Sequence, residues 1–421
     1  MNRQRTDPAA MPTGARLTPL GYYLIAHGSW YASHGLQNVM FAWLVTMVLN
    51  ESPTMVGVAQ TAMLIPATLF MLVGGSVADR IGGQRVAFAA QSAAVLPPLI
   101  LSVVLFSGSL SFPVMVGYAL AFGLVQAFVI PARDGLLNSV AEGRVQRAVV
   151  KSIFVQFSVQ LLGFGLAGSA EWVGGHWIVL IQAAVLGAGA LAIQRIKTAG
   201  SGNAQKSASI SLGQLIAEGF RSVMQSAAMR GVVMQNVAMG VFFMGTYIVT
   251  LPLIIREIYN GSSADLAIVT ATNSLGLLST IFILLRFGDV RRQGRALTIA
   301  HLAGSLALAG ASLGFGFHAF AACMFLWGAS GGIAVTMSRT IMQEHAPDDL
   351  RGRVMGFFSF SFLGSGPVGA LLWGFTIEKI GPEHSMMAAA AAMLAVVSTV
   401  SVTTGLWRVG PPPRVARSGG S

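Results

Sequence analysis

Residues 74–85 read Gly-Gly-Ser-Val-Ala-Asp-Arg-Ile-Gly-Gly-Gln-Arg, a short charged segment between two long apolar stretches. A similar segment, Arg-Phe-Gly-Asp-Val-Arg-Arg-Gln-Gly-Arg, occupies 286–295. In both copies an acid is followed six residues later by an arginine, giving Asp79 with Arg85 and, 210 residues on, Asp289 with Arg295. A second pair of loops repeats at an offset of 206 and aligns Arg133, Arg147, Gly163 and Gly168 with Arg339, Arg353, Gly369 and Gly374. Such repeats between apolar stretches are typical of membrane proteins built from two related halves.

The composition also places the chain in a membrane. It is 54% hydrophobic and 10% charged, against roughly 25% charged residues in soluble domains. The net charge of +11 would favour nucleic-acid binding in a soluble protein, but the basic residues lie between apolar stretches, so we expect a lipid bilayer and no nucleic acid as partner. The single cysteine, Cys323, has no partner for an internal disulfide, and no metal-ligand spacing is present.

Hydropathy predicts an all-α membrane protein with twelve transmembrane helices of about 20 residues each. The expected spans are 20–48, 54–77, 86–106, 112–132, 148–170, 175–195, 231–255, 263–286, 295–315, 319–341, 354–376 and 385–407. The turns that begin at Asn50 and Asn260 also differ by 210 positions, which supports the repeat independently of the charged segments. We therefore expect two pseudo-symmetric bundles of six helices.

The expected organisation has two tails, two bundles and a linker. The tails cover 1–19 and 408–421, the bundles 20–195 and 231–407, and the linker 196–230. The linker begins with a flexible polar stretch. In its second part, apolar residues at helical spacing predict an amphipathic helix from Ser211 to Met224 that lies at the membrane interface. This helix can be a plain tether between the halves or a regulatory element.

The distribution of basic residues predicts the orientation. With the amino terminus in the cytoplasm, 24 of the 26 lysines and arginines fall on the cytoplasmic side, and Arg256 and Lys379 are the exceptions. Positive charge accumulates on the cytoplasmic side of membrane proteins. The first 19 residues lack the apolar core and cleavage site of a signal peptide. We expect a multi-pass protein of a bacterial cytoplasmic (inner) membrane with both termini in the cytoplasm.

Three stretches carry a resemblance to a known family. They are Ser52-Pro53 through Asp79-Arg80, Ile130-Pro-Ala-Arg133, and Pro347-Asp-Asp-Leu-Arg-Gly-Arg-Val354. Together with the span count and the repeat, they resemble the major facilitator superfamily, and within it the drug- and siderophore-exporter branch that includes enterobactin exporters and macrolide efflux pumps. The resemblance covers about 20–407. It implies the major facilitator fold and alternating access, with a drug-like or siderophore-like compound as the exported substrate.

The repeated loops predict a cytoplasmic latch. A carboxylate is favoured at a helix amino terminus and near guanidinium groups, so we expect Asp79 to face the helix start at Arg351 and Arg353. The symmetric contact sets Asp289 against the helix start at Arg144 and Arg147. The alternative is that these charges only set the topology. The predicted gating residues are Asp79, Arg80, Arg85, Arg133, Asp289, Arg295, Arg339, Arg351 and Arg353.

A polar and aromatic stripe on the first span is the main candidate for the substrate path. Polar groups are costly against lipid, so this face should meet a central cavity, although the aromatic residues can also belong to an interfacial belt and glutamines can join helices. The predicted substrate-binding residues are His27, Trp30, Tyr31, His34 and Asn38 on the first span, Gln156 and Gln160 on the fifth, and Gln235, Asn236, Phe243 and Tyr247 on the seventh.

The fifteen acids all lie outside the centres of the predicted spans. If an antiporter is coupled to protons, His27 and His34 are therefore the candidates, because histidine titrates near neutral pH; either can instead be a neutral cavity residue. No nucleotide-binding loop is present, and Asp348-Asp349, the nearest approach to a catalytic cluster, is better explained as a helix cap. We expect a monomeric transporter for a small-molecule substrate, no enzyme activity and no cofactor. Importers and non-transporting sensors with a carrier fold remain the alternatives.

Overall fold

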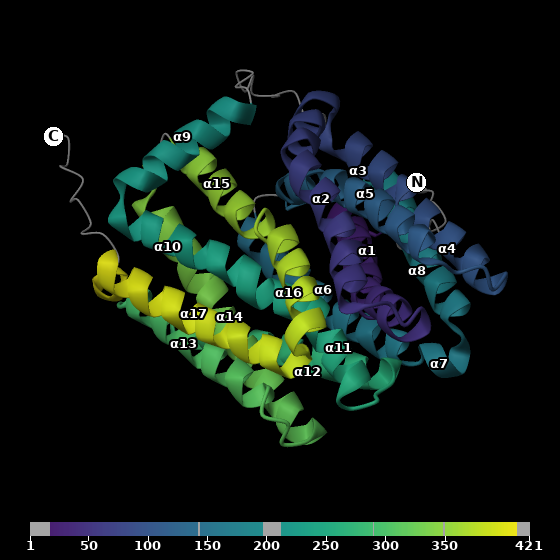
Figure 1. Ribbon diagram of the computed structural model, residues 1–421. Coiled ribbons are helices and arrows are strands. Elements are labelled where there is room, and N and C mark those ends of the chain that lie inside the picture. Colours follow the sequence, from purple (N-terminus) through teal and green to yellow (C-terminus); the bar gives the residue numbers. More distant parts are fainter. Residues whose placement is uncertain (1–16, 142–143, 197–211, 289, 348–349, 411–421) are drawn as a thin grey trace, which may run out of the picture.

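The computed structural model describes residues 17–141, 144–196, 212–288, 290–347 and 350–410, and within these ranges it contains helices and no β-strand (Figure 1). Ten of the described helical runs are long and apolar enough to cross a membrane. Two further long helices, α1 and α13, have 25 and 19 residues. Together they form the twelve expected transmembrane helices.

The first half of the chain forms one bundle. Its elements are α1 (Pro19–Trp43), the π-helical turn η1 (Leu44–Val48), α2 (Pro53–Ile81), α3 (Gly83–Ala93), α4 (Leu96–Phe106), α5 (Phe112–Val140), α6 (Val145–Gly168), α7 (Ala170–Val173) and α8 (Gly175–Gln194). We call this set the N bundle. In Figure 1 its colours run from purple through blue to the first teal.

The second half forms the C bundle, preceded by the linker helix α9 (Leu212–Gln225). The elements of the C bundle are α10 (Ala227–Ala238), the π-helical turns η2 (Met239–Met244) and η3 (Thr246–Thr250), α11 (Leu251–Glu257), α12 (Ser263–Phe287), α13 (Gln293–Ala311), α14 (Phe317–His345), α15 (Arg351–Leu363), α16 (Gly366–Ile380), α17 (Pro382–Thr403) and the short η4 (Leu406–Arg408).

The turns before α2 and α12 repeat in conformation as well as in sequence. Asn50 and Asn260 adopt φ angles of 50° and 46°, a left-handed region that asparagine tolerates better than most residues. Ser52 and Ser262 then cap the two helices, each accepting a hydrogen bond from the main-chain N–H of the third residue along. The same local chemistry therefore starts both helices.

Glycines allow the helices within each bundle to cross closely. A Cβ on Gly163 of α6 would lie 2.6 Å from the carbonyl oxygen of Ala32 in α1, and a Cβ on Gly369 of α16 would lie 2.4 Å from that of Val241 in η2. Real side chains do not approach so closely, so both positions require glycine. The repeated glycine pairs predicted from the sequence therefore serve helix packing.

The two bundles meet along α2 with α16 and along α6 with α12. These interfaces are related by the sequence repeat. A Cβ on Gly57 would lie 3.2 Å from the Cα of Gly374, and a Cβ on Gly168 would lie 2.9 Å from the Cβ of Ala267. Residues 57 and 267 differ by 210, and residues 168 and 374 differ by 206. A pseudo-twofold axis therefore runs between the bundles.

The bundles have two ends. We call the end with the turns at 50–52 and 258–262 the turn end, and the end with the loops after α2, α5, α12 and α14 the motif end. Hydrogen bonds join the described residues of the two bundles at the turn end and along α2. Arg256 donates to the carbonyl oxygens of Thr46 at 2.9 Å and Glu51 at 2.8 Å. Figure 1 shows α11, α12 and α7 gathered at this end.

Four predicted spans differ from the observed helices, and the first of them, 20–48, ends in the π-helical turn η1. The span 86–106 is interrupted between α3 and α4, just before Pro97 and Pro98, and 354–376 is interrupted between α15 and α16, just before Pro367. Proline lacks the N–H that would continue the helical ladder. The seventh span contains η2 and η3, whose wider turns local hydropathy does not reveal.

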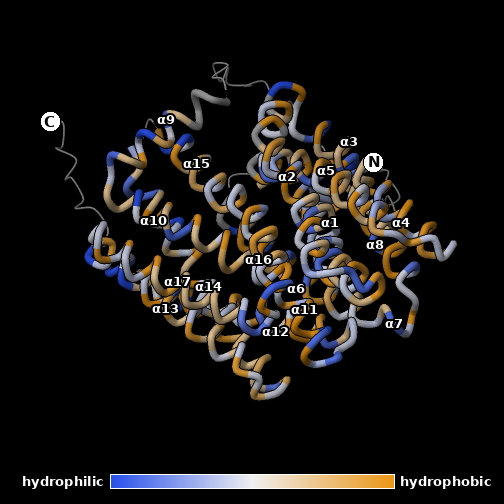
Figure 2. The backbone as a smooth tube through the Cα atoms, viewed as in Figure 1, coloured by the Kyte–Doolittle hydropathy of each residue, from blue (hydrophilic) through white to orange (hydrophobic). Residues whose placement is uncertain are grey.

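The linker helix α9 forms where the amphipathic pattern predicts a helix, and it packs on α15. Val223 is fully buried there, and Glu218 forms an ion pair with Arg353. Figure 2 shows hydrophilic residues gathered around α9 and at helix ends, with hydrophobic residues along most helix lengths. The linker thus reaches the motif end of the C bundle.

Candidate functional site

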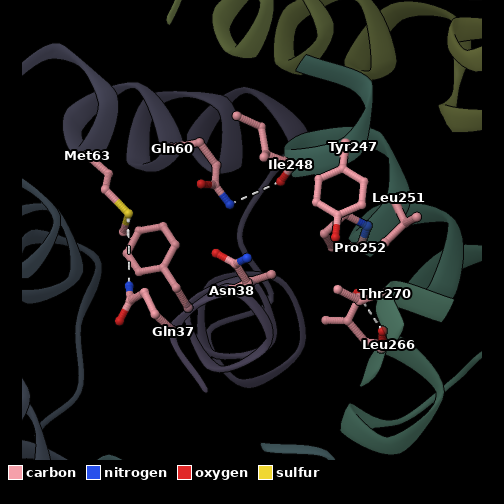
Figure 3. A pocket seen from close by; sticks show the side chains of 12 residues that line it. Gln37, Asn38, Gln60, Met63, Tyr247, Ile248, Leu251, Pro252, Leu266 and Thr270 are labelled. Atoms are coloured by element: carbon pink, nitrogen blue, oxygen red, sulfur yellow. Dashed lines mark hydrogen bonds between the residues drawn. The ribbon is translucent and has the colours of Figure 1, made fainter. Parts of the chain in front are cut away.

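A pocket lies between the two bundles (Figure 3). Its cavity volume is about 40 Å³, room for water-sized molecules. Its walls come from α1 and α2 on one side and from η3, α11 and α12 on the other. The lining residues are Gln37, Asn38, Phe41, Ala42, Gln60, Met63, Tyr247, Ile248, Leu251, Pro252, Leu266 and Thr270.

The pocket wall combines neutral polar groups with apolar and aromatic surface, and none of its lining residues is charged. Gln60 reaches across from the N bundle and donates a hydrogen bond to the carbonyl oxygen of Ile248 at 3.0 Å. Asn38 and Tyr247 line the pocket from opposite bundles. This lining offers a few hydrogen-bonding groups beside apolar surface, a combination that suits an amphipathic ligand.

Gln37 is held in position by a buried network in the N bundle. Its Oε1 accepts hydrogen bonds from the Tyr118 hydroxyl and, at 3.0 Å, from Gln182 Nε2. Gln182 also donates to Ser33 at 3.2 Å. Gln37 Nε2 in turn donates to the Met63 sulfur at 4.0 Å, so both ends of the amide are held in one orientation at the pocket wall.

Of the predicted substrate-binding residues, Asn38 and Tyr247 line this pocket. His27, Trp30, Tyr31 and His34 lie further toward the motif end on α1, in ring contact with one another or with α5. The His27 and Tyr31 ring centroids are 4.9 Å apart, and those of Tyr31 and His34 are 6.5 Å apart. Trp30 stacks on Phe122 of α5 at 5.9 Å.

The predicted glutamines of α6 lie along the crossing with α1. Gln156 is beside the His27 ring. The carbonyl oxygen of Gln160 would lie 2.4 Å from a Cβ on Gly35, so α1 and α6 cross closely there. Both side chains are half-buried.

The remaining predicted residues of the seventh span make contacts inside the C bundle. Gln235 is fully buried and bonds His301 Nδ1 at 2.9 Å and Ser401 at 3.1 Å. Asn236 donates to Ser361 at 2.8 Å. Phe243 lies edge-on against Trp327, with centroids 5.6 Å apart.

The predicted gating residues are distributed over the motif end. Arg353 pairs with Glu218 of α9, and Arg295 lies over the Trp407 ring at 4.8 Å. Arg80, Arg85, Arg339 and Arg351 have exposed side chains. Arg133, by contrast, is completely buried in α5. Asp289, together with Asp348-Asp349, falls outside the described residues, and the structure does not describe the Asp79 side chain.

Sequence reasoning missed the polar contacts that join the bundles at the turn end. Glu171 Oε1 accepts hydrogen bonds from the main-chain N–H of Ser263 at 2.9 Å and from Trp43 Nε1 at 3.2 Å, and Thr54 donates to Glu378. The sequence did give one signal for these contacts: Arg256 is one of two basic residues that fall at the turn end, away from the others. Gln60 and Thr270 of the pocket had no comparable signal.

Comparisons with known proteins agree with the fold. The profile of the Major Facilitator Superfamily matches residues 23–370. No curated protein sequence matches the chain. Among solved structures, a point mutant of the nucleoside transporter NupG is 14% identical with a TM-score of 0.74, covering 91% of this chain and 99% of that one. The inward-open xylose transporter XylE from E. coli is 12% identical with a TM-score of 0.68, covering 94% and 97%.

Proposed function

The chain belongs to the Major Facilitator Superfamily, and from this premise we propose that it is a secondary active transporter that moves a bulky amphipathic molecule by alternating access. The observation that carries the proposal is the pocket between the bundles, lined from both sides by neutral polar, apolar and aromatic groups. A site at the interface of two repeats is exposed in turn to each side of the membrane as the bundles rock.

The contacts along α2 and at the turn end support this motion. Thr61 and Thr68 of α2 donate to the carbonyl oxygens of Pro367 at 3.3 Å and Leu363 at 3.2 Å. In our proposal these bonds and those of Arg256 break when the bundles separate from the turn end inward. In our proposal the repeated loops then close the motif end through Asp79 and Asp289, in the predicted latch.

We propose export as the direction and a drug-like or siderophore-like compound as the substrate. The support is the resemblance of the loop motifs to that exporter branch, together with a pocket wall without charge. We further propose that the protein acts as a monomer in a bacterial inner membrane, with both termini in the cytoplasm and the motif end facing inward. If protons drive transport through His34, His34→Gln will remove the pH dependence of flux.

Flux measurements test the proposal. Purified protein in proteoliposomes should transport at least one compound found by screening a deletion strain for altered accumulation of antibiotics, dyes and iron chelators. Asn38→Ala should reduce that flux, because the side chain lines the pocket, while Gly117→Ala should not, since a Cβ there meets open space. Binding without movement would instead identify a sensor.

Cysteine labelling tests the orientation. In a Cys323→Ser background, cysteines at Ser109 and Ser262 should react with an impermeant thiol reagent added to intact cells, and a cysteine at Ser201 should not. Labelling at Ser201 would reverse the orientation inferred from the basic residues.

A further inference from the structure

Arg133 is a buried cation with few polar contacts. Its side chain is 0% exposed, and none of its three guanidinium nitrogens makes a hydrogen bond of normal geometry in the described part of the chain, although the Tyr31 side chain lies close enough for a weak one. Asp134 Oδ1 lies 3.6 Å away, but that side chain is 62% exposed. A buried charge normally has a hydrogen-bonded partner, because removing it from water is costly.

The surroundings of Arg133 form a cradle of rings on α1. The guanidinium carbon lies 4.9 Å from the Tyr31 ring centroid and 5.8 Å from that of Trp30. His27 and His34 flank Tyr31. His27 Nε2 and His34 Nδ1 are also buried without a hydrogen-bond partner. We call Arg133, Tyr31, Trp30, His27 and His34 the arginine cradle.

The fold itself does not require a cation at this place. α5 (Phe112–Val140) and α14 (Phe317–His345) correspond at an offset of 205 residues, which places Ser338 opposite Arg133. Ser338 is a small buried residue, 3% exposed. At the offset of 206 suggested by the sequence, the partner is Arg339, whose side chain is exposed. The equivalent helix pair therefore packs without a buried charge.

The aromatic part of the cradle is also specific to the N bundle. The crossing of Gly35 with Gly163 matches that of Val241 with Gly369, an offset of 206. At this offset the counterparts of the cradle residues on α1 are Val233, Asn236, Val237 and Gly240. The rings of the cradle therefore occur only in the N bundle, which also holds the buried arginine.

We propose that the arginine cradle binds the carboxylate of an amphipathic organic acid whose apolar body extends into the pocket between the bundles. The planar guanidinium fork matches a carboxylate in geometry. Tyr31 and His34 are half-buried, and Asn38, one helical turn beyond His34, lines the pocket. Tyr31 and Asn38 are seven residues apart, about 10 Å along a helix. The proposal rests on the proposed transport function and names its substrate class.

An amphipathic acid fits this arrangement better than a small inorganic anion. The cradle walls are aromatic, and Tyr31, His34 and Asn38 follow one another along α1 from the cradle to the pocket, so aromatic surface adjoins the cation. A chloride or acetate ion would use the guanidinium group alone and leave this surface without a function.

A matched pair of probes tests the proposal in detergent-solubilised protein. Phenylhexanoate carries a carboxylate on an apolar body, and phenylhexanamide has the same shape without the charge. Thermal-shift titration should show that the acid binds about ten-fold or more tightly than the amide, the scale of one charge-assisted hydrogen bond. Chloride and acetate should bind more weakly than phenylhexanoate.

Variants test whether Arg133 causes the preference for the acid over the amide. Arg133→Gln should abolish the preference for acid over amide. Arg133→Lys keeps the charge without the fork and should retain part of the preference, and it provides the test should the glutamine variant not fold. Arg286→Gln removes an exposed arginine and should leave the preference unchanged. Three results would overturn the proposal: equal affinity for acid and amide, equal affinity for chloride and phenylhexanoate, or a preference for the acid that survives Arg133→Gln.

Failure of the acid-binding site and failure of the transport function give different results. Acid preference without flux of any compound would leave the cradle in place and refute transport. Flux of screened compounds with no acid preference would retain the transporter and refute the cradle.

Discussion

The N and C bundles share their helix crossings but differ in the chemistry placed on them. In the N bundle, Gln91 donates to Ser29 at 2.8 Å. In the C bundle, the equivalent pair is His301 with Gln235, at 2.9 Å. Residues 91 and 301 differ by 210 and residues 29 and 235 by 206. The repeat has preserved where helices touch, while the identity of the polar groups has diverged.

The two halves differ around Arg133. The N bundle holds a fully buried arginine among rings, and the C bundle has Ser338 with Val233, Asn236, Val237 and Gly240 at the same level. The difference separates the residues needed for helix packing from those needed to bind a ligand. Close packing acts on both halves equally, because both must form the same crossings. A ligand group needs only one binding site, so a single half can supply it.

The largest effect is expected at the symmetric contacts between bundles. Gly57→Leu and Gly168→Leu should each abolish transport, because a Cβ would lie 2.6 Å from the Ala370 carbonyl oxygen or 2.9 Å from the Ala267 Cβ. Each bundle keeps its own core, so the protein should still fold. Flux and size-exclusion behaviour check this, with Gly117→Leu as control at an open position. Loss of transport in only one of the two variants would show that the two interfaces are not equivalent.

The next effect concerns the latch. Asp79→Asn keeps the shape of the side chain but removes the charge that a helix start and arginines stabilise. We expect about ten-fold slower flux, corresponding to roughly 1.4 kcal/mol, near-normal membrane insertion, and greater labelling of cysteines at the motif end. Asp289→Asn should act similarly if both latches work. Normal flux in Asp79→Asn would leave the acid as a solvated loop residue.

A smaller effect is expected at His34, whose counterpart in the C bundle is Gly240. His34→Ala should weaken binding or flux about five-fold, roughly 1 kcal/mol, without lowering thermal stability, because His34 Nδ1 has no protein hydrogen bond to lose. His318→Ala, at an exposed histidine of α14 outside the arginine cradle, is the control. A fall in stability with unchanged transport per folded molecule would place His34 in helix packing.

The smallest effect should come from the paired networks. His301→Ala leaves Gln235 Oε1 without its bond, and we expect it to lower the free energy of unfolding by about 1 kcal/mol, the scale of hydrogen bonds between membrane helices. Gln91→Ala should do the same in the N bundle. Transport per folded molecule should be unchanged in both. Thermal unfolding and flux on matched amounts of folded protein measure these outcomes, and lost transport would give the networks a functional role.

The sequence predicted the fold because hydropathy and turn chemistry act locally. The span 263–286 corresponds to α12 at Ser263–Phe287, and 175–195 to α8 at Gly175–Gln194. The break before Pro97 was missed, because an apolar run gives the same hydropathy whether its helix is continuous or interrupted. The fold class was confirmed in full, because it depends on these local patterns and on the repeat.

The site was harder to predict, because it depends on which faces meet. Asn38 and Tyr247 line the pocket, whereas Gln235 and Asn236 share the seventh span with Tyr247 and turn into the bundle. The π-helical turns η2 and η3 rotate the faces of that span relative to a regular helix. The burial of Arg133 also had no sequence signal, because its neighbours on α1 are about 100 residues away.

The contacts across the bundle interface are directed mainly at the main chain. Arg256 bonds the carbonyl oxygens of residues 46 and 51, and Gln60, Thr61 and Thr68 bond those of residues 248, 367 and 363. Every amino acid carries such a carbonyl, so the accepting residue can change during evolution without a compensating change in its partner. Covariation between related sequences should therefore be weak at these contacts, and stronger for Thr54 with Glu378, where both partners are side chains.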